Sequence, residues 1–232
     1  KIQEKNKNPS YLFLFSRYYL NMFKKLFHKL FSDESPFPFI LFLFILPVAS
    51  IYFGIVPVEY RIVALMVISL FIFGYIRRSG WGADELGFHP SSWKAGILPY
   101  SLFTIVGVAV TVWVGKSYFP VPEIPWWQDT RLISLFVLIS FAQEFVFRGF
   151  LMKFLAEFWK SPYKIIITNA ILFALIHVIY QSPEIGVPLA FVGGIFFSGI
   201  YYFFPNIVYV SVVHSILNFL AVYYGIFGAV IN

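Results

Sequence analysis

Seven apolar runs, each about as long as a bilayer is thick, constrain this chain more than any other feature of its sequence. An α-helix needs about 20 apolar residues to cross about 30 Å of hydrocarbon. The strands of a membrane barrel would instead alternate between apolar and polar residues over segments of about ten. The sequence therefore predicts an all-α fold, a polytopic membrane helix bundle of about seven transmembrane helices. The expected spans are Phe37–Val56, Tyr60–Ile76, Ile97–Tyr118, Leu132–Leu155, Tyr163–Tyr180, Val187–Phe204 and Ile207–Phe227.

The composition excludes the common alternatives to a membrane protein. Apolar residues make up 59% of the 232 residues and charged residues only 12%. Soluble domains carry about 45–50% and about 25%, respectively. The chain has no cysteine, which excludes disulfides, cysteine-ligated zinc, iron–sulfur clusters and thiol nucleophiles.

The basic residues are grouped between the apolar runs and predict an orientation. If the N-terminus is cytoplasmic, thirteen lysines and arginines lie on the inner side and three on the outer side. This bias predicts a cytoplasmic N-terminus and an outer C-terminus. We attribute the net charge of +6 to topology and anionic headgroups, and we expect no nucleic-acid partner. The expected location is a membrane, most simply the inner membrane of a prokaryotic cell.

The segment before the first span differs from the rest of the chain. Residues 1–36 are expected to form a cytoplasmic or interfacial segment, and residues 37–232 a single transmembrane domain. Within Tyr11–Phe31, apolar residues such as Phe23 and Phe27 recur at helical spacing, and lysines fall on the other side. This pattern predicts an amphipathic helix lying in the membrane interface, with an eighth span as the alternative.

Polar side chains form a stripe on each of spans four, five and seven. A charged group at mid-membrane costs about 2.5–3.5 kcal/mol even on insertion scales, so such residues are candidates for function. Glu144 and Arg148 are four residues apart, share a helix face and can pair. We expect the three stripes to converge on one buried, water-accessible pocket. The stripes are Gln143-Glu144…Arg148, Asn169…Phe173…His177 and Ser211…His214…Asn218.

These residue types suit the hydrolysis of a peptide bond. A carboxylate or a histidine can take a proton from water. A second histidine and an amide, here His214 and Asn218, can donate hydrogen bonds to the oxyanion that develops. Each stripe alone also has a structural interpretation. A histidine or Asn169 can act as an interhelical hydrogen-bond donor, and the Glu–Arg pair can be a purely structural ion pair. The ordered combination on three spans favours a site.

The three stripes resemble the signature of the intramembrane CAAX protease family, also called the CPBP or Abi family, which includes the type II CAAX prenyl endopeptidases. The family pattern is Glu-Glu-x-x-x-Arg, Phe-x-x-x-His and His-x-x-x-Asn or Asp on successive helices. The resemblance extends over a core of about residues 84–227, and Leu86-Gly87 is similar to an upstream element of the family.

The resemblance implies a metal-independent, glutamic-type intramembrane endopeptidase. Its substrate would be a membrane-associated protein or peptide, with lipid-modified proteins among the candidates, cut near the C-terminus. No cofactor is expected. Position 143 and His177 would activate water, His214 and Asn218 would stabilise the oxyanion, and Glu144 and Arg148 would shape the pocket. The candidate catalytic residues are Gln143, Glu144, His177, His214 and Asn218, and the pocket residues are Arg148 and Phe173.

One residue departs from the family pattern: Gln143 stands where the family has its first glutamate. A neutral amide cannot accept a proton from water at a useful rate. Three explanations are open: an engineered inactive variant, a natural member that acts as a scaffold or regulator, or a base role for Glu144 and His177. The first two predict that this chain is inactive.

Other functions stay open at the level of sequence. Glu144, His177 and His214 are acceptable zinc ligands, although the His-Glu-x-x-His spacing of common zinc proteases is absent. The same polar residues could serve a small transporter or proton channel. A non-catalytic membrane regulator is the main alternative to the protease. The sequence does not predict an oligomeric state.

Overall fold

The computed structural model describes residues 35–88, 92–119 and 130–227, and these residues form helices and connections without a strand. The predicted all-α class is confirmed. The α-helices are α2 (Phe37–Ile40), α3 (Leu46–Tyr52), α4 (Arg61–Ser79), α5 (Ser92–Tyr118), α6 (Thr130–Glu144), α7 (Met152–Phe158), α8 (Pro162–Leu175), α9 (Pro183–Phe203) and α10 (Ile207–Tyr223). The structure also has short 3₁₀ turns at Val58–Tyr60, Asp84–Leu86 and Ile176–Ile179. Two segments are π-helical, Leu41–Ile45 and Phe145–Leu151.

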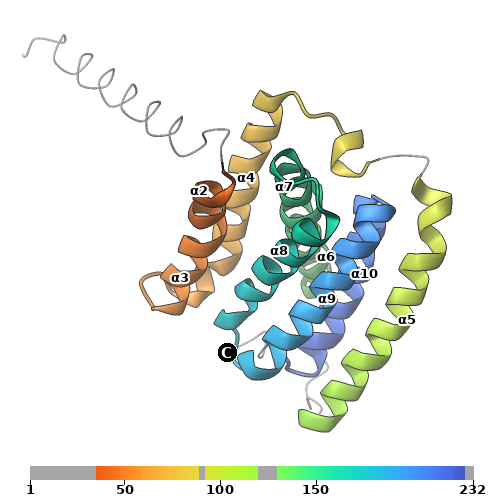
Figure 1. Ribbon diagram of the computed structural model, residues 1–232. Coiled ribbons are helices and arrows are strands. Elements are labelled where there is room, and N and C mark those ends of the chain that lie inside the picture. Colours follow the sequence, from red (N-terminus) through yellow and green to blue (C-terminus); the bar gives the residue numbers. More distant parts are fainter. Residues whose placement is uncertain (1–34, 89–91, 120–129, 228–232) are drawn as a thin grey trace, which may run out of the picture.

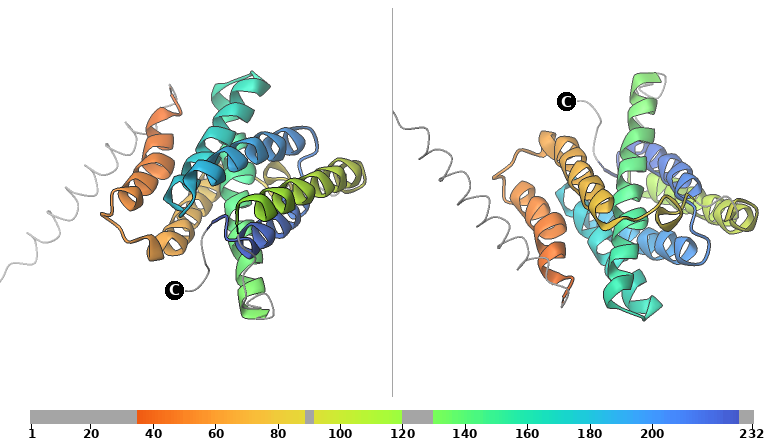
Figure 2. Two further views of the ribbon diagram at one scale, coloured as in Figure 1. Left: turned by 90° about the horizontal axis from the view of Figure 1, so that it is seen from below. Right: turned by 90° about the horizontal axis from the view of Figure 1, so that it is seen from above.

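The helices form one bundle around α6, α8, α9 and α10. Helix α10 packs against both α6 and α5, and α8 packs along α9 (Figure 1). The end-on views show α2 and α3 at one side of this group and α5 at the opposite side (Figure 2). The central helices are therefore covered from both sides, and they carry the three polar stripes.

Among the described residues, five helices are long and apolar enough to cross a membrane: Val58–Ser79, Trp93–Tyr118, Ser134–Phe158, Pro162–Ile179 and Pro183–Phe203. Two shorter apolar helices, Phe37–Tyr52 and Ile207–Tyr223, correspond to the first and last predicted spans. The protein is thus an integral membrane protein of apolar helices. The count of seven spans, the domain division, the prokaryotic membrane and the orientation stay predictions, and the Tyr11–Phe31 helix lies outside the described residues.

Two of the predicted spans are continuous helices but not regular α-helices. Leu41–Ile45 is π-helical, and Pro47 follows closely. Proline has no N–H for the carbonyl of Leu43, so the regular hydrogen-bond ladder cannot continue there. The second π-helical segment, Phe145–Leu151, lies inside the span that carries the first polar stripe. Such segments are frequent at functional sites.

The connection between α4 and α5 is fixed to the bundle by Leu86 and Gly87. The Leu86 side chain is buried, and the Gly87 carbonyl accepts a hydrogen bond of 3.0 Å from the Ile207 N–H at the start of α10. Gly87 has φ +79°, a left-handed conformation. A Cβ on Gly87 would overlap the hydroxyl of Tyr201. Leu86 and Gly87 therefore pack the connection between α4 and α5 against Tyr201 and the start of α10.

Glu85 holds the same connection from its exposed side. Its carboxylate accepts a 2.8 Å hydrogen bond from the Gly82 N–H and lies 3.1 Å from Lys153 Nζ at the start of α7. The Gly82 hydrogen bond, followed by the Lys153 ammonium, holds the pKa of Glu85 below its usual range.

Replacing Gly87 with alanine is expected to destabilise the protein more than the same change at Gly80. Both residues have left-handed φ angles, and a Cβ on Gly80 meets nothing within 4 Å. The two variants share the backbone strain, of about 1–2 kcal/mol. Only Gly87→Ala adds the overlap with Tyr201, which should cost about 1–3 kcal/mol more. Thermal unfolding in detergent measures the difference, and equal melting temperatures would contradict the packing role of Gly87.

Candidate active site

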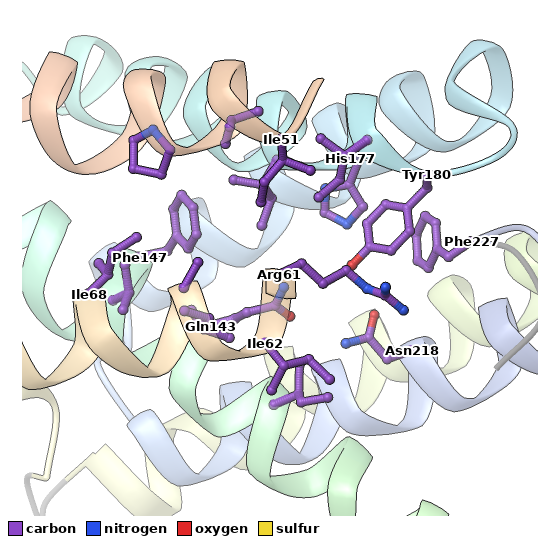
Figure 3. Close-up of a pocket in the computed structure, with 18 of the residues that line it drawn as sticks. Ile51, Arg61, Ile62, Ile68, Gln143, Phe147, His177, Tyr180, Asn218 and Phe227 are labelled. Carbon is purple, nitrogen blue, oxygen red and sulfur yellow. The ribbon is translucent and has the colours of Figure 1, made fainter. Parts of the chain in front are cut away.

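Gln143, His177 and Asn218 line one cavity of about 280 Å³ (Figure 3). They come from α6, the 3₁₀ turn after α8, and α10, so three separate helical elements supply its polar groups. Arg61 and Tyr180 add two more polar side chains. Much of the remaining wall is apolar and belongs to α3, α4 and the segment before α3, with Leu43, Phe44, Val48, Ile51, Leu65 and Ile68. An apolar cavity with a few converging polar groups is typical of an active site.

The surroundings of His177 define its neutral tautomer. Its Nδ1 lies 2.8 Å from the carbonyl oxygen of Phe173, and a carbonyl only accepts hydrogen bonds. Nδ1 therefore carries a proton, and in the neutral ring Nε2 has the free lone pair. The ring is 3% exposed and is held between Phe173 and Phe227, with ring centres 5.0 and 4.9 Å away. His177 is thus a fixed imidazole with a proton-accepting nitrogen.

Gln143 presents an uncharged acceptor to the cavity. Its side chain is 6% exposed, and its Oε1 makes no hydrogen bond with any described residue. A buried amide oxygen without a partner is costly, so a water molecule or a substrate N–H is the natural group to satisfy it. The oxygen can accept such a hydrogen bond but cannot take up the proton.

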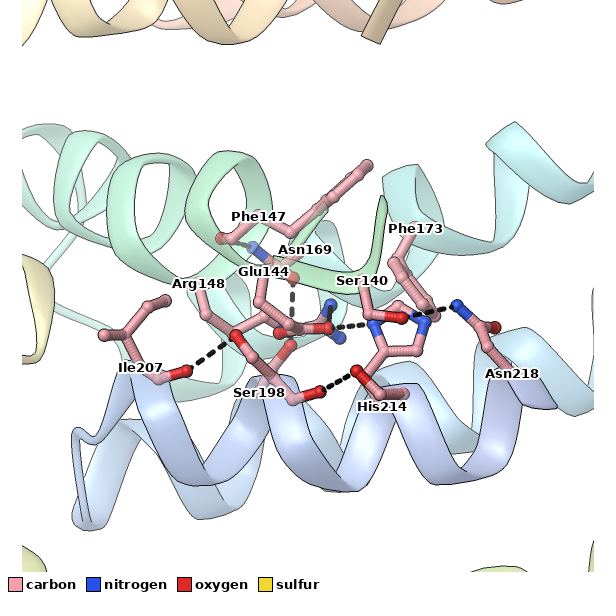
Figure 4. A network of polar contacts seen from close by, with 12 residues as sticks. Ser140, Glu144, Phe147, Arg148, Asn169, Phe173, Ser198, Ile207, His214 and Asn218 are labelled. Atoms are coloured by element: carbon pink, nitrogen blue, oxygen red, sulfur yellow. Dashed lines mark hydrogen bonds and ion pairs between the residues drawn. The ribbon is translucent and has the colours of Figure 1, made fainter. Parts of the chain in front are cut away.

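Glu144 does not line this cavity and instead links two other site residues (Figure 4). Its Oε1 accepts a 3.0 Å hydrogen bond from Arg148 Nη1 and lies 2.6 Å from His214 Nδ1. All three side chains are buried. The predicted Glu144–Arg148 pair is confirmed. A carboxylate at Nδ1 favours a proton on that nitrogen, so Glu144 orients the His214 ring.

Arg148 lies fully buried in an aromatic cage. Its guanidinium carbon is 4.3 Å from the ring centre of Phe173, 5.1 Å from that of Phe197 and 5.9 Å from that of Phe147. Ring faces attract cations, which offsets part of the cost of burying this one. The centre of the Phe173 ring also lies 5.4 Å from that of the His214 ring. Phe173, a predicted pocket residue, therefore contacts both the charged Arg148 and the candidate catalytic residue His214.

Asn169 is a helix-to-helix connector. Its Nδ2 donates to the Phe147 carbonyl at 2.6 Å, and its Oδ1 accepts from the Ser198 hydroxyl at 3.0 Å. The first of these bonds reaches into the π-helical segment Phe145–Leu151, where it satisfies a carbonyl of the irregular turn. The interpretation of Asn169 as an interhelical hydrogen-bond donor is confirmed.

Sequence reasoning missed the role of Ser140. Its Oγ accepts a 3.1 Å hydrogen bond from Asn218 Nδ2, so one of the two amide N–H groups of Asn218 is already engaged. Ser140 precedes Glu144 by four residues, which places both on one face of α6 and could have identified it. The oxyanion role of the His214–Asn218 pair stays a prediction.

A second cavity, of about 440 Å³, also reaches the histidines. It lies among α5, α9 and α10, is almost entirely apolar, and includes His177, His214 and Asn218 in its wall. The two apolar cavities thus share His177 and Asn218, whereas Gln143 lines only the first cavity and His214 only the second.

The zinc alternative lacks a ligand set. Glu144 and His214 are in contact, but no group of three histidine, cysteine, aspartate or glutamate residues in the described part of the chain could hold a metal ion. Structural zinc has four ligands and catalytic zinc at least three protein ligands.

A comparison with protein families gives a match over the segment that carries all three stripes. Residues 125–220 match the family described as type II CAAX prenyl endopeptidase Rce1-like. Comparisons with curated proteins and with solved structures gave no match. The match includes Gln143, Glu144, Arg148, His177 and His214, and it ends two residues beyond Asn218. Over residues 125–220, this helical membrane protein is therefore similar to the Rce1-like type II CAAX prenyl endopeptidases, a family of proteases.

Proposed function

We propose that the chain is an intramembrane endopeptidase that cleaves a membrane-associated protein or peptide near its C-terminus. The observation that carries the proposal is the fixed imidazole of His177, whose Nδ1 is bound by the Phe173 carbonyl in the cavity that Gln143 and Asn218 also line. Nε2 of this ring is the proton acceptor that peptide hydrolysis needs.

The site supports a complete hydrolytic step. Gln143 Oε1 accepts one hydrogen bond from a water molecule, and His177 Nε2 takes the other proton as the water oxygen attacks the peptide carbonyl carbon. The oxygen of that carbonyl becomes the oxyanion, which the N–H groups of His214 and Asn218 stabilise. The proton on His177 then passes to the amine that leaves as the C–N bond breaks.

The environment of His214 supports its part in this step. Because Glu144 holds Nδ1, the ring can offer Nε2–H to the oxyanion only when both nitrogens are protonated. Glu144 stabilises that imidazolium, and Arg148 in turn fixes the carboxylate. The three residues then act as one positioning unit.

Gln143 favours a second candidate, a non-catalytic membrane scaffold or regulator of the same fold. Replacement of a carboxylate base by an isosteric amide is the change expected in a protein that keeps the binding cavity and loses the chemistry. Such a protein would bind a membrane partner at the cavity and would not hydrolyse it.

A cleavage assay with the reconstituted protein separates the two candidates. The probe is a fluorescent peptide that ends in a farnesylated cysteine and three further residues, presented in liposomes. We expect slow cleavage by the native sequence and faster cleavage by Gln143→Glu. In the Gln143→Glu background, His177→Ala and His214→Ala should each reduce the rate by about 100-fold or more.

Ser215→Ala is the matched control, since Ser215 is the neighbour of His214 and donates within α10 to the Ser211 carbonyl. Its rate should equal that of the parent. The protease proposal is overturned by the absence of cleavage in Gln143→Glu, or by cleavage that survives both histidine substitutions.

A further inference from the structure

The cavity at His177 contains a cation that the hydrolytic step does not use. Arg61 begins α4 and is half-buried, and its side chain belongs to the cavity wall. Figure 3 shows its guanidinium turned into the cavity, toward the part that Tyr180 and Asn218 also line. Arg61 precedes the segment that matches the protease family, so the match assigns it no role.

The polar partners of Arg61 are uncharged. Its Nη1 donates to the Val58 carbonyl at 3.1 Å, its side chain hydrogen-bonds that of Tyr180, and its guanidinium carbon lies 5.9 Å from the ring centre of Tyr180. No carboxylate among the described residues forms an ion pair with it. Arginine has five N–H donors in a fork that matches a carboxylate. A guanidinium in an apolar cavity beside the membrane therefore lacks its anion.

We propose that this cavity takes the C-terminal end of the peptide substrate, with its terminal carboxylate bound by Arg61. The inference rests on the proposed peptidase function. The cavity, of about 280 Å³, admits a short peptide segment and not a folded domain. A three-residue extended segment spans about 10 Å. With the carboxylate at Arg61, the bond a few residues upstream would lie toward His177, so Arg61 sets the distance of the cut from the C-terminus.

The charge balance favours a carboxylate in the cavity over a lipid phosphate at its rim. The guanidinium lines the same cavity as Gln143 and His177, whereas an anionic headgroup would stay in the water interface. The free end of a peptide is the one carboxylate that every linear substrate carries. Peptide recognition therefore needs no acidic side chain.

Paired peptide mixtures test the proposal by binding and by cleavage. The probe is a mixture of octapeptides with randomised positions, made once as C-terminal acids and once as C-terminal amides. The native protein, immobilised in nanodiscs of neutral lipid, is exposed to both, and mass spectrometry measures the retained peptides. We expect acids to be retained about tenfold over amides, since one charge-assisted hydrogen bond supplies about that factor.

Variants identify the cation responsible. Arg61→Gln should abolish the acid preference without changing amide retention, and Arg61→Lys should keep part of it because the charge remains without the fork. Arg77→Gln is the matched control, since Arg77 is exposed in the last turn of the same helix. It should behave like the native protein.

Cleavage of the same peptides by Gln143→Glu gives the kinetic counterpart. There the acid should have a KM about tenfold below that of the amide, with similar kcat, and Arg61→Gln should remove the difference. Equal retention of acids and amides, a preference that survives Arg61→Gln, or no retention at all overturns the proposal. So does an Arg61 dependence seen only when phosphatidylglycerol is present, which would make the ligand a lipid. Retention without cleavage rejects the peptidase function and leaves the carboxylate site standing.

Discussion

Replacing Gln143 with glutamate is expected to raise kcat/KM for peptide cleavage by about 10²–10⁴, the usual contribution of a positioned general base. The cause is local. Gln143 is buried, lines the cavity with His177, and has an amide oxygen with no hydrogen-bond partner in the described part of the chain. Glutamate has nearly the same shape, so the new carboxylate oxygen would occupy the position of the amide and take the proton that the amide cannot.

The measurement is the initial rate with the farnesylated peptide in liposomes at constant protein. Gln143→Asp is the informative control, because it supplies the same charge on a chain one methylene shorter. We expect it to recover much less activity, since proton transfer requires hydrogen-bond distance. Gln143→Ala should fall to or below the native rate through loss of the water-binding oxygen. Equal measurable rates for the native sequence and Gln143→Glu would reject a base at this position and leave His177 as the base, whereas no cleavage by either protein would favour the scaffold.

The parts of the site that follow from helical spacing could be predicted from the sequence. Glu144 and Arg148 pair as their four-residue separation indicates, and His177 lies over its own helix at Phe173. The contacts among the three stripes agree with the cost of isolated charged groups in lipid, but Glu144 and Arg148 line neither cavity, so a single shared pocket stays a prediction.

The remaining features depend on tertiary contacts that spacing does not encode. The π-helical segment Phe145–Leu151 changes the direction of side chains within a span that reads as a regular helix. Arg61 lies more than eighty residues before the first stripe, and in the sequence it is one of the basic residues between spans that indicate membrane orientation. The packing of the helices nevertheless places it in the wall of the cavity. Which member of Gln143-Glu144 faces the cavity was likewise open until the fold placed Glu144 against His214.

Replacing Arg148 with methionine is expected to destabilise the folded protein by about 3–5 kcal/mol. Methionine fills much of the volume inside the cage of Phe147, Phe173 and Phe197 but removes the guanidinium that donates a 3.0 Å hydrogen bond to Glu144. The carboxylate would then stay buried, and among the described residues His214 is the other polar side chain that contacts it. An uncompensated buried charge is the main cost of breaking such a pair.

The double variant Glu144→Gln, Arg148→Met separates charge from packing. It removes both charges while the cage stays filled, so it should recover most of the lost stability, because a buried ion pair replaced by uncharged groups is often neutral. Unfolding in SDS, followed by circular dichroism, measures both variants. Arg78→Met, at an exposed arginine in the last turn of α4, is the control and should change the free energy of unfolding by less than about 0.5 kcal/mol.

A cleavage assay then tests whether the double variant, although stable, has lost catalytic activity. In the Gln143→Glu background the double variant should fold and still cleave poorly, because a neutral amide at position 144 no longer stabilises a doubly protonated His214. Full activity in a stable double variant would mean that His214 donates without Glu144 and that the ion pair serves folding alone. A single variant as stable as the native protein would show instead that Glu144 is already uncharged in the bundle, and the positioning role of Arg148 would be rejected.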